Sequence, residues 1–188
     1  MSHVLSIAGN PGASPKSSGI LEYSHQFLRR KGLTTHAISI RCLPAEPLLR
    51  GDSHHPEIQD AIARVAQAEG VIVVTPVSKG SYTGILKAFL DILPCNALRD
   101  KVVLPIVTSC TAGQLLVLEY ALKPVLSALG ARNILDGVYL TDYQMQFAHG
   151  GKLQLEDSAE EALDQALQQL TAEVRRLSAQ SSTADWVI

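Results

Sequence analysis

Apolar residues along this chain follow two spacings, which alternate from one end to the other. Short runs rich in Val, Ile and Leu are typical of strands buried on both faces of a parallel sheet. Longer stretches with apolar residues every three or four positions are typical of helices that cover such a sheet. The expected strands span residues 4–8, 34–40, 70–75, 101–108 and 133–140, and the expected helices span residues 17–30, 56–68, 84–93, 115–129 and 159–177.

This alternation predicts a single doubly wound α/β domain over residues 1–177, followed by a Ser-rich C-terminal tail over residues 178–188. At 188 residues, of which 46% are hydrophobic, the chain can bury one full core. The flavodoxin-like strand order 2-1-3-4-5 would place the loops after the first and third strands in one crevice. The tail is expected to be mobile or docked on a neighbouring subunit.

Charge, the N-terminal residues, cysteines and histidines limit which partners, locations and metal sites are expected. The net charge of −2 comes from scattered residues of both signs, so no nucleic-acid partner is expected. The first nine residues form too short an apolar run for a leader or a membrane span, which predicts a cytoplasmic protein with no membrane contact. Cys42, Cys95 and Cys110 form no CxxC pair, which argues against a disulfide framework or a thiolate metal site. His54 and His55, adjacent in a polar loop, are more typical of solvated side chains than of metal ligands.

The loop after the first strand has the composition of a phosphate site. Residues 9–18 read Gly-Asn-Pro-Gly-Ala-Ser-Pro-Lys-Ser-Ser and lead directly into a helix. Hydroxyls, backbone N–H groups and the cation of Lys16 at a helix N-terminus favour a bound anion. The loop lacks both the P-loop ending and the dinucleotide glycine spacing. The alternative is that Ser17 or Ser18 only caps the helix.

Two further loops of small residues follow the third and fourth strands. The second loop, residues 76–84, has little bulk, so its backbone can approach a planar heterocycle while Tyr82 offers an aromatic face. The third loop, residues 108–113, belongs at the same sheet edge. Together the loops suit a mononucleotide, and a flavin better than an adenine nucleotide. Cys110 has no histidine placed by the sequence to activate it as a nucleophile.

The sequence resembles the NAD(P)H-dependent FMN reductases of flavodoxin-like fold, and within them the reductases of the alkanesulfonate system. The resemblance is most specific in the second loop, in Lys-Val-Val-Leu-Pro at residues 101–105, and in Tyr-Ala-Leu-Lys-Pro-Val-Leu-Ser-Ala-Leu at residues 120–129. It implies hydride transfer from NADPH or NADH to FMN, with FMN as a substrate or a loosely bound cofactor. It also implies an FMNH2-dependent monooxygenase as partner, and a homo-oligomer that is a dimer or a tetramer.

The resemblance also assigns the FMN phosphate to the first loop and the isoalloxazine ring to the other two. The implied FMN-binding residues are Asn10, Ser14, Lys16, Ser17 and Ser18, then Pro76, Val77, Ser78, Lys79, Gly80, Ser81 and Tyr82, then Thr108, Ser109, Cys110 and Thr111. Tyr120 matches a tyrosine that lies, in this subfamily, in a helix with an inserted residue at the tetramer interface, where it helps flavin to leave. Inserted residues of that kind form π-bulges. Gly12 stands where the family commonly has an arginine, which makes Lys16 the cation of the first loop.

Hydride transfer requires stacked rings and stabilised negative charge on the flavin, which backbone N–H groups can supply, so no catalytic acid or base is expected. Two alternatives stay open. An FMN-retaining quinone or azo reductase would pass the hydride on by a ping-pong route. A flavodoxin-like electron carrier would keep FMN and meet protein partners, although such carriers are usually strongly acidic. The helix over residues 115–129 carries enough apolar surface either to be fully covered or to face another subunit.

Overall fold

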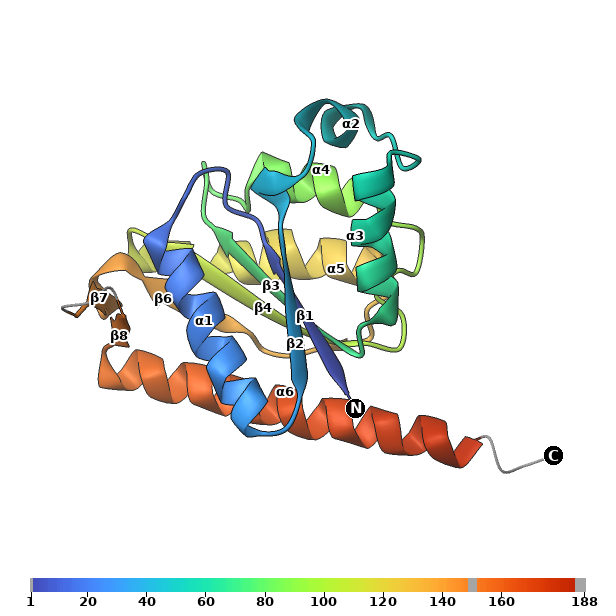
Figure 1. Ribbon diagram of the computed structural model, residues 1–188. Helices are drawn as coiled ribbons and strands as arrows, with labels where there is room; N and C mark the ends of the chain where they lie inside the picture. The colour runs from blue at the N-terminus through green and yellow to red at the C-terminus, as the bar shows by residue number, and fades with distance from the viewer. Residues whose placement is uncertain (1, 149–151, 185–188) are drawn as a thin grey trace.

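The computed structural model describes residues 2–148 and 152–184, and its centre is a parallel sheet (Figure 1). The main strands are β1 (His3–Ala8), β2 (Thr34–Ser39), β3 (Gly70–Pro76), β4 (Val102–Ser109) and β5 (Asn133–Ile134). They pair in the order β2-β1-β3-β4-β5, and every pairing is parallel. This confirms the flavodoxin-like order and places the switch point between β1 and β3.

The fifth strand is split, which corrects the prediction of one continuous strand over residues 133–140. Both β5 and β6 (Val138–Thr141) pair with β4. Gly137 lies between them with a φ of 87°, a left-handed conformation that cannot continue a strand. Beyond this break, β6 runs to the same edge of the sheet as the carboxyl end of β4.

Helices cover both faces of the sheet (Figure 1). One face carries α1 (Pro15–Arg30) and α6 (Asp157–Ala184), and the other carries α3 (Pro56–Gln67), α4 (Gly84–Ile92) and α5 (Lys123–Ala128). Alternate residues of β3 separate the two halves of the core. Val71 and Val73 pack with residues of α3, α4 and α5, whereas Ile72 and Val74 pack with residues of α1 and α6. A strand that is apolar on both faces is therefore buried on both, as its sequence predicts.

The structure contains elements that the sequence pattern did not predict. The 3-10 turn η1 (Ile40–Cys42) and the short helix α2 (Ala45–Arg50) occupy the connection from β2 to α3, and β7 (Met145–Phe147) pairs with β8 (Leu153–Leu155) in an antiparallel hairpin before α6. Residues 178–184, predicted as tail, continue α6, because this segment contains no glycine or proline to end the helix. Residues 185–188 of the predicted tail lie outside the described residues.

The residues that the structure describes form no membrane-spanning helix, no metal-binding cluster and no cysteine pair. No described helix is long and apolar enough to cross a bilayer. Within residues 2–148 and 152–184, no cluster of three or more His, Cys, Asp or Glu side chains is placed to hold a metal ion. Cys42, Cys95 and Cys110 are exposed free thiols, His54 is exposed, and His55 is partly buried.

Candidate functional site

The first loop, between β1 and α1, is joined to the second loop across the switch point. The Gly9 N–H donates to the Val74 carbonyl of β3 at 2.8 Å, and the Thr83 hydroxyl donates to the Gly9 carbonyl. The same hydroxyl caps α4 by accepting the N–H of Leu86 at 3.3 Å. A Cβ at Gly9 would lie 2.9 Å from the Leu86 Cβ, so only glycine allows this approach of loop and helix. The first two loops therefore lie side by side at the switch point.

Helix α1 begins two residues earlier than the sequence predicted. Pro15 occupies its first turn, a favoured position for proline, and Ser14 is the N-cap. The Ser14 hydroxyl accepts the N–H and the hydroxyl of Ser17, both at 3.3 Å. Ser17 is thereby buried, whereas Ser18 is exposed. The capping role that the sequence left open for Ser17 or Ser18 thus belongs to Ser14.

Free backbone donors gather between Asn10 and the first turn of α1. The buried Asn10 amide donates to the Gly12 carbonyl, which bends the loop back on itself. In the part of the chain that the structure describes, the N–H groups of Gly12, Ala13 and Lys16 have no hydrogen-bond acceptor. Unpaired N–H groups at the positive end of a helix dipole attract phosphate. This cradle of N–H groups therefore offers donors of the kind that bind an anion.

Lys16, the cation of the first loop, is paired with a residue that the sequence analysis missed. Its ammonium lies 3.0 Å from Asp142 Oδ1 and donates to the Asp142 backbone carbonyl at 3.4 Å. Asp142 begins the 3-10 turn η4 (Asp142–Gln144) directly after β6. An acidic residue just beyond an expected strand end was the available signal, because the carboxyl ends of parallel strands meet at one edge.

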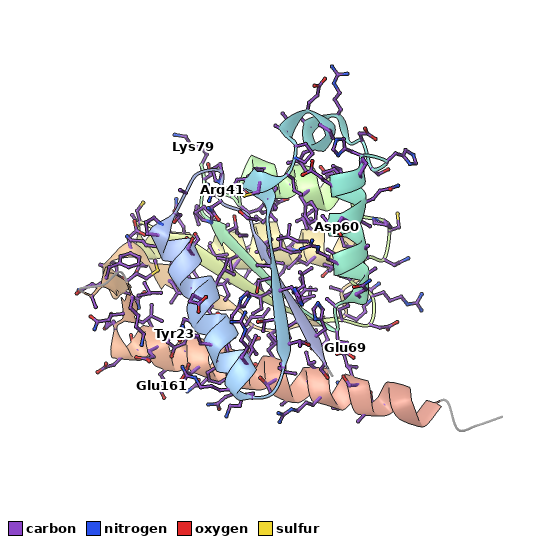
Figure 2. The ribbon with its side chains drawn as sticks, viewed as in Figure 1. Tyr23, Arg41, Asp60, Glu69, Lys79 and Glu161 are labelled. Carbon is purple, nitrogen blue, oxygen red and sulfur yellow. The ribbon has the colours of Figure 1, made fainter. Side chains whose placement is uncertain are left out.

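The second loop is a tight hairpin at the tip of the site. Ser78 and Ser81 exchange backbone hydrogen bonds of 2.7 and 3.1 Å. Lys79 and Gly80 between them have φ values of 52° and 77°, the positive sign that a type I′ turn requires at both positions. Figure 2 shows the Lys79 side chain pointing away from the body of the molecule. Backbone groups of this turn are therefore presented at the surface, with little side-chain bulk around them.

The base of the second loop is held by the sheet and the core. The Val77 N–H donates to the Thr108 carbonyl of β4 at 2.7 Å, which extends the strand pairing beyond Pro76. Tyr82 is partly buried and packs against the core, and this burial raises the pKa of its phenol above the usual value. The Tyr82 ring is therefore neutral at physiological pH and available as an uncharged aromatic surface.

The third loop begins at the end of β4, beside the second. The Ser109 hydroxyl donates to the Gln114 side-chain carbonyl at 2.7 Å and accepts the Thr111 N–H at 3.3 Å. Tyr139 of β6 donates its hydroxyl to the Thr111 carbonyl. Ser109 is buried, whereas Thr111 and the free thiol of Cys110 are exposed. Tyr139 is the second residue at this edge that the sequence analysis missed.

The structure thus brings the three predicted loops to one edge of the sheet, although Ser17 and Thr108 lie buried beneath it. A cavity of about 470 Å³ links the tip of the second loop to the segment after the third. Its lining includes Gly80, Gln114, Val117 and Tyr120. Tyr120 therefore borders the region of the second loop, which the sequence placed at the flavin ring.

The segment that carries Tyr120 is not a regular α-helix. The helix predicted over residues 115–129 consists of a π-helical segment η3 (Leu118–Leu122) followed by α5, and the 3-10 turn η2 (Ala112–Gln114) precedes it. The expected π-bulge at Tyr120 is thereby confirmed. Pro124 has no N–H to donate to the Tyr120 carbonyl, which favours a widened turn. The Tyr120 side chain is 79% exposed.

Known proteins resemble this chain over most of its length. A family model described as NADPH-dependent FMN reductase matches residues 2–146. The FMN reductase (NADPH) of Pseudomonas putida is 43% identical over 166 residues, which cover 88% of this chain and 84% of that protein. The FMN reductase (NADPH) of Escherichia coli (strain K12) is 39% identical over 165 residues, with coverage of 88% and 86%.

A solved structure agrees with these sequence matches. The apo form of NADH:FMN oxidoreductase (EMOB) superposes with a TM-score of 0.82 at 32% identity, over 92% of this chain and 89% of that chain. The strand order is that of the flavodoxin-like fold, and the three loops lie at the carboxyl edge of the sheet, where such folds bind their ligands. This chain therefore belongs to the NADPH-dependent FMN reductase family, as an NAD(P)H:FMN oxidoreductase of flavodoxin-like fold.

Proposed function

We propose that this reductase treats FMN as an exchanging substrate and supplies reduced FMN to a partner monooxygenase that acts on organosulfur compounds such as alkanesulfonates. The observation that carries this proposal is the π-helical segment with an exposed Tyr120 beside the second loop. A π-helical insertion disturbs the regular hydrogen bonding of a helix, and such insertions are frequently found at functional sites. We place the reaction in the cytoplasm, where reduced nicotinamide nucleotides are produced.

We assign the FMN phosphate to the cradle of the first loop, and the ring to the hairpin Ser78–Ser81, Tyr82 and the third loop. Bound FMN supplies the acceptor for a hydride from C4 of the nicotinamide. With both nucleotides bound, the loops would position the two rings for hydride transfer, which would lower the entropic cost of their encounter. Backbone N–H groups of the second and third loops would stabilise the negative charge that the ring gains. No side chain is needed as an acid or a base.

An open site favours exchange of the flavin. Ser78, Lys79 and Gly80 are exposed, so a ring that lies on this hairpin keeps part of its surface in water. A ligand that buries only part of its surface gains less free energy from binding than one enclosed in a pocket. We expect the surface around Tyr120 to contact a second copy of the chain, in a dimer or a tetramer.

The first test is NADPH oxidation by flavin-stripped protein, followed by the nicotinamide absorbance with and without added FMN, and with NADH in parallel. We expect a rate that rises and saturates with free FMN. Stoichiometric flavin retained through purification, with ping-pong kinetics toward quinones, would instead favour a retained-cofactor reductase. No FMN-dependent oxidation with either nucleotide, in protein that still binds FMN, would favour an electron carrier or a reductase that needs another acceptor.

Coupling to a monooxygenase tests the second half of the proposal. We expect sulfite release when the reductase, NADPH and FMN are added to a purified FMNH2-dependent alkanesulfonate monooxygenase with an alkanesulfonate. The reaction without the reductase is the control. Active FMN reduction without sulfite release would contradict the proposed partner and leave the reductase activity in place.

A further inference from the structure

The ion pair between Lys16 and Asp142 lies at the phosphate side of the proposed site. The Lys16 ammonium has three N–H donors, and it contacts both the carboxylate and the backbone carbonyl of Asp142, at 3.0 and 3.4 Å. The two side chains are 32% and 47% exposed, so an incoming anion can reach the pair. The main cation of the first loop is therefore already engaged by a negative group of the chain itself.

Asp142 is held at this place by its turn. The buried Thr141 pairs with Ser109 in the register of β6 and β4. Its N–H and its hydroxyl donate to Gln144 Oε1 at 2.9 and 2.6 Å, which completes a capping box around η4. Because the turn is fixed to the end of a strand, the Asp142 carboxylate is held beside the first loop.

A phosphate that enters the cradle meets this carboxylate. A phosphate monoester carries about 1.5 to 2 negative charges near pH 7. It must either displace Asp142 from Lys16 or share the ammonium with a like charge nearby, and each reduces the free energy of binding. We propose that Asp142 is a specificity-determining residue, which weakens binding of the FMN phosphate by competing for Lys16 and so keeps FMN exchangeable.

This inference rests on the proposed phosphate site. It predicts that Asp142 affects binding of FMN and not of riboflavin, whereas a residue that only stabilises the fold would affect both. Riboflavin has the same ring as FMN but no phosphate. Loss of the Asp142 carboxylate should therefore tighten binding of FMN and leave binding of riboflavin unchanged. Reduced FMN keeps the phosphate, so the same competition favours its release to a partner.

The test measures dissociation constants of FMN and riboflavin by quenching of flavin fluorescence in the full-length protein. We expect Asp142→Asn to lower the Kd of FMN about two- to fivefold, the scale of a partly exposed ion pair, without changing the Kd of riboflavin. Asp142→Glu should restore the wild-type value. Lys16→Gln should raise the Kd of FMN alone.

A matched control comes from the opposite face of the sheet. Asp60 also pairs with a cation, Arg64, at 2.7 Å, and Figure 2 shows it on α3, away from α1. Asp60→Asn makes the same change in net charge, and it should leave both dissociation constants unchanged. A lower Kd of FMN in this control would show a general effect of charge and would overturn the inference.

The outcomes separate the inference from the function on which it rests. If Lys16→Gln weakens FMN binding while Asp142→Asn leaves it unchanged or weaker, the phosphate site stands and the competition is wrong. If neither variant changes the Kd of FMN, both the phosphate site and the inference fail. Equal tightening of FMN and riboflavin by Asp142→Asn would also overturn the inference, because the effect would not act through the phosphate.

Discussion

Among single residues of the site, Gly9 has little room for a side chain. A Cβ there would lie 2.9 Å from the Leu86 Cβ and 3.1 Å from its Cδ2, and Leu86 is fully buried. We predict that Gly9→Ala lowers the free energy of unfolding by about 1–3 kcal/mol, because α4 must shift and loosen the contact of Thr83 with the first loop. Urea denaturation measures this change.

Gly12 provides the matched control in the same loop. A Cβ at Gly12 would meet nothing within 4 Å, and its φ lies outside the left-handed region. Gly12→Ala is expected to change the free energy of unfolding by less than about 0.5 kcal/mol. Equal destabilisation by both substitutions would show that loop flexibility, rather than contact with Leu86, explains the effect at Gly9.

Single residues of the site also show what can and cannot be predicted from the sequence. Small polar residues after apolar strands are visible in the sequence, so the three loops were placed correctly at one edge. Asp142 and Tyr139 were missed because neither belongs to a loop of small polar residues, although the predicted pairing of the fifth strand with the fourth brings both to this edge. Ser14 was not recognised as the cap, although Pro15 behind it is a known signal for the first turn of a helix.

Among the elements, η3 connects the fold most directly to the proposed exchange of flavin. Tyr120 projects from this π-helical segment, 79% exposed, and borders the cavity at the tip of the second loop. We predict that Tyr120→Ala retains FMN more tightly and turns over free FMN several-fold more slowly, because the phenol no longer competes for the edge of the flavin site. Flavin content after purification and kcat/KM for FMN measure the two effects.

Tyr120→Phe is the control for this variant, since it keeps the aromatic ring and removes only the hydroxyl. It is expected to resemble the wild-type protein in flavin content and in rate. If Tyr120→Ala also leaves both quantities unchanged, the role of η3 in flavin exchange is wrong, and the π-helical segment serves another purpose.

Elements differ in how far the sequence predicts them. Long apolar runs identified β1, β3 and β4, because a strand buried on both faces has a distinctive composition. The hairpin of β7 and β8 was missed, since its three-residue strands are too short to show a period. It is instead held by burial of Met145 and Leu153 against the core of α1 and α6.

At the scale of the whole molecule, large exposed apolar side chains gather around η3. The exposed fractions are 52% for Leu115, 63% for Leu116 and 79% for Tyr120. A contiguous apolar surface of this kind on a protein often marks a contact with another molecule. A second copy of the same surface would cover them in a two-fold symmetric interface. We therefore predict that sedimentation velocity shows a species heavier than the 20.2 kDa chain, a dimer or a tetramer.

Leu116→Glu tests this interface, because it places a charge in the middle of the apolar surface. We expect it to shift the protein toward the monomer and, since Tyr120 lies on the same surface, to change the amount of FMN retained.

Leu49→Glu is the control for this variant. Leu49 is 76% exposed on α2, away from η3, and its substitution should leave the sedimentation coefficient unchanged. Dissociation by Leu49→Glu alone would move the interface to α2 and separate assembly from flavin exchange. Dissociation by Leu116→Glu without any change in FMN retention would keep the interface at η3, but it would leave Tyr120 to act on flavin within a single subunit.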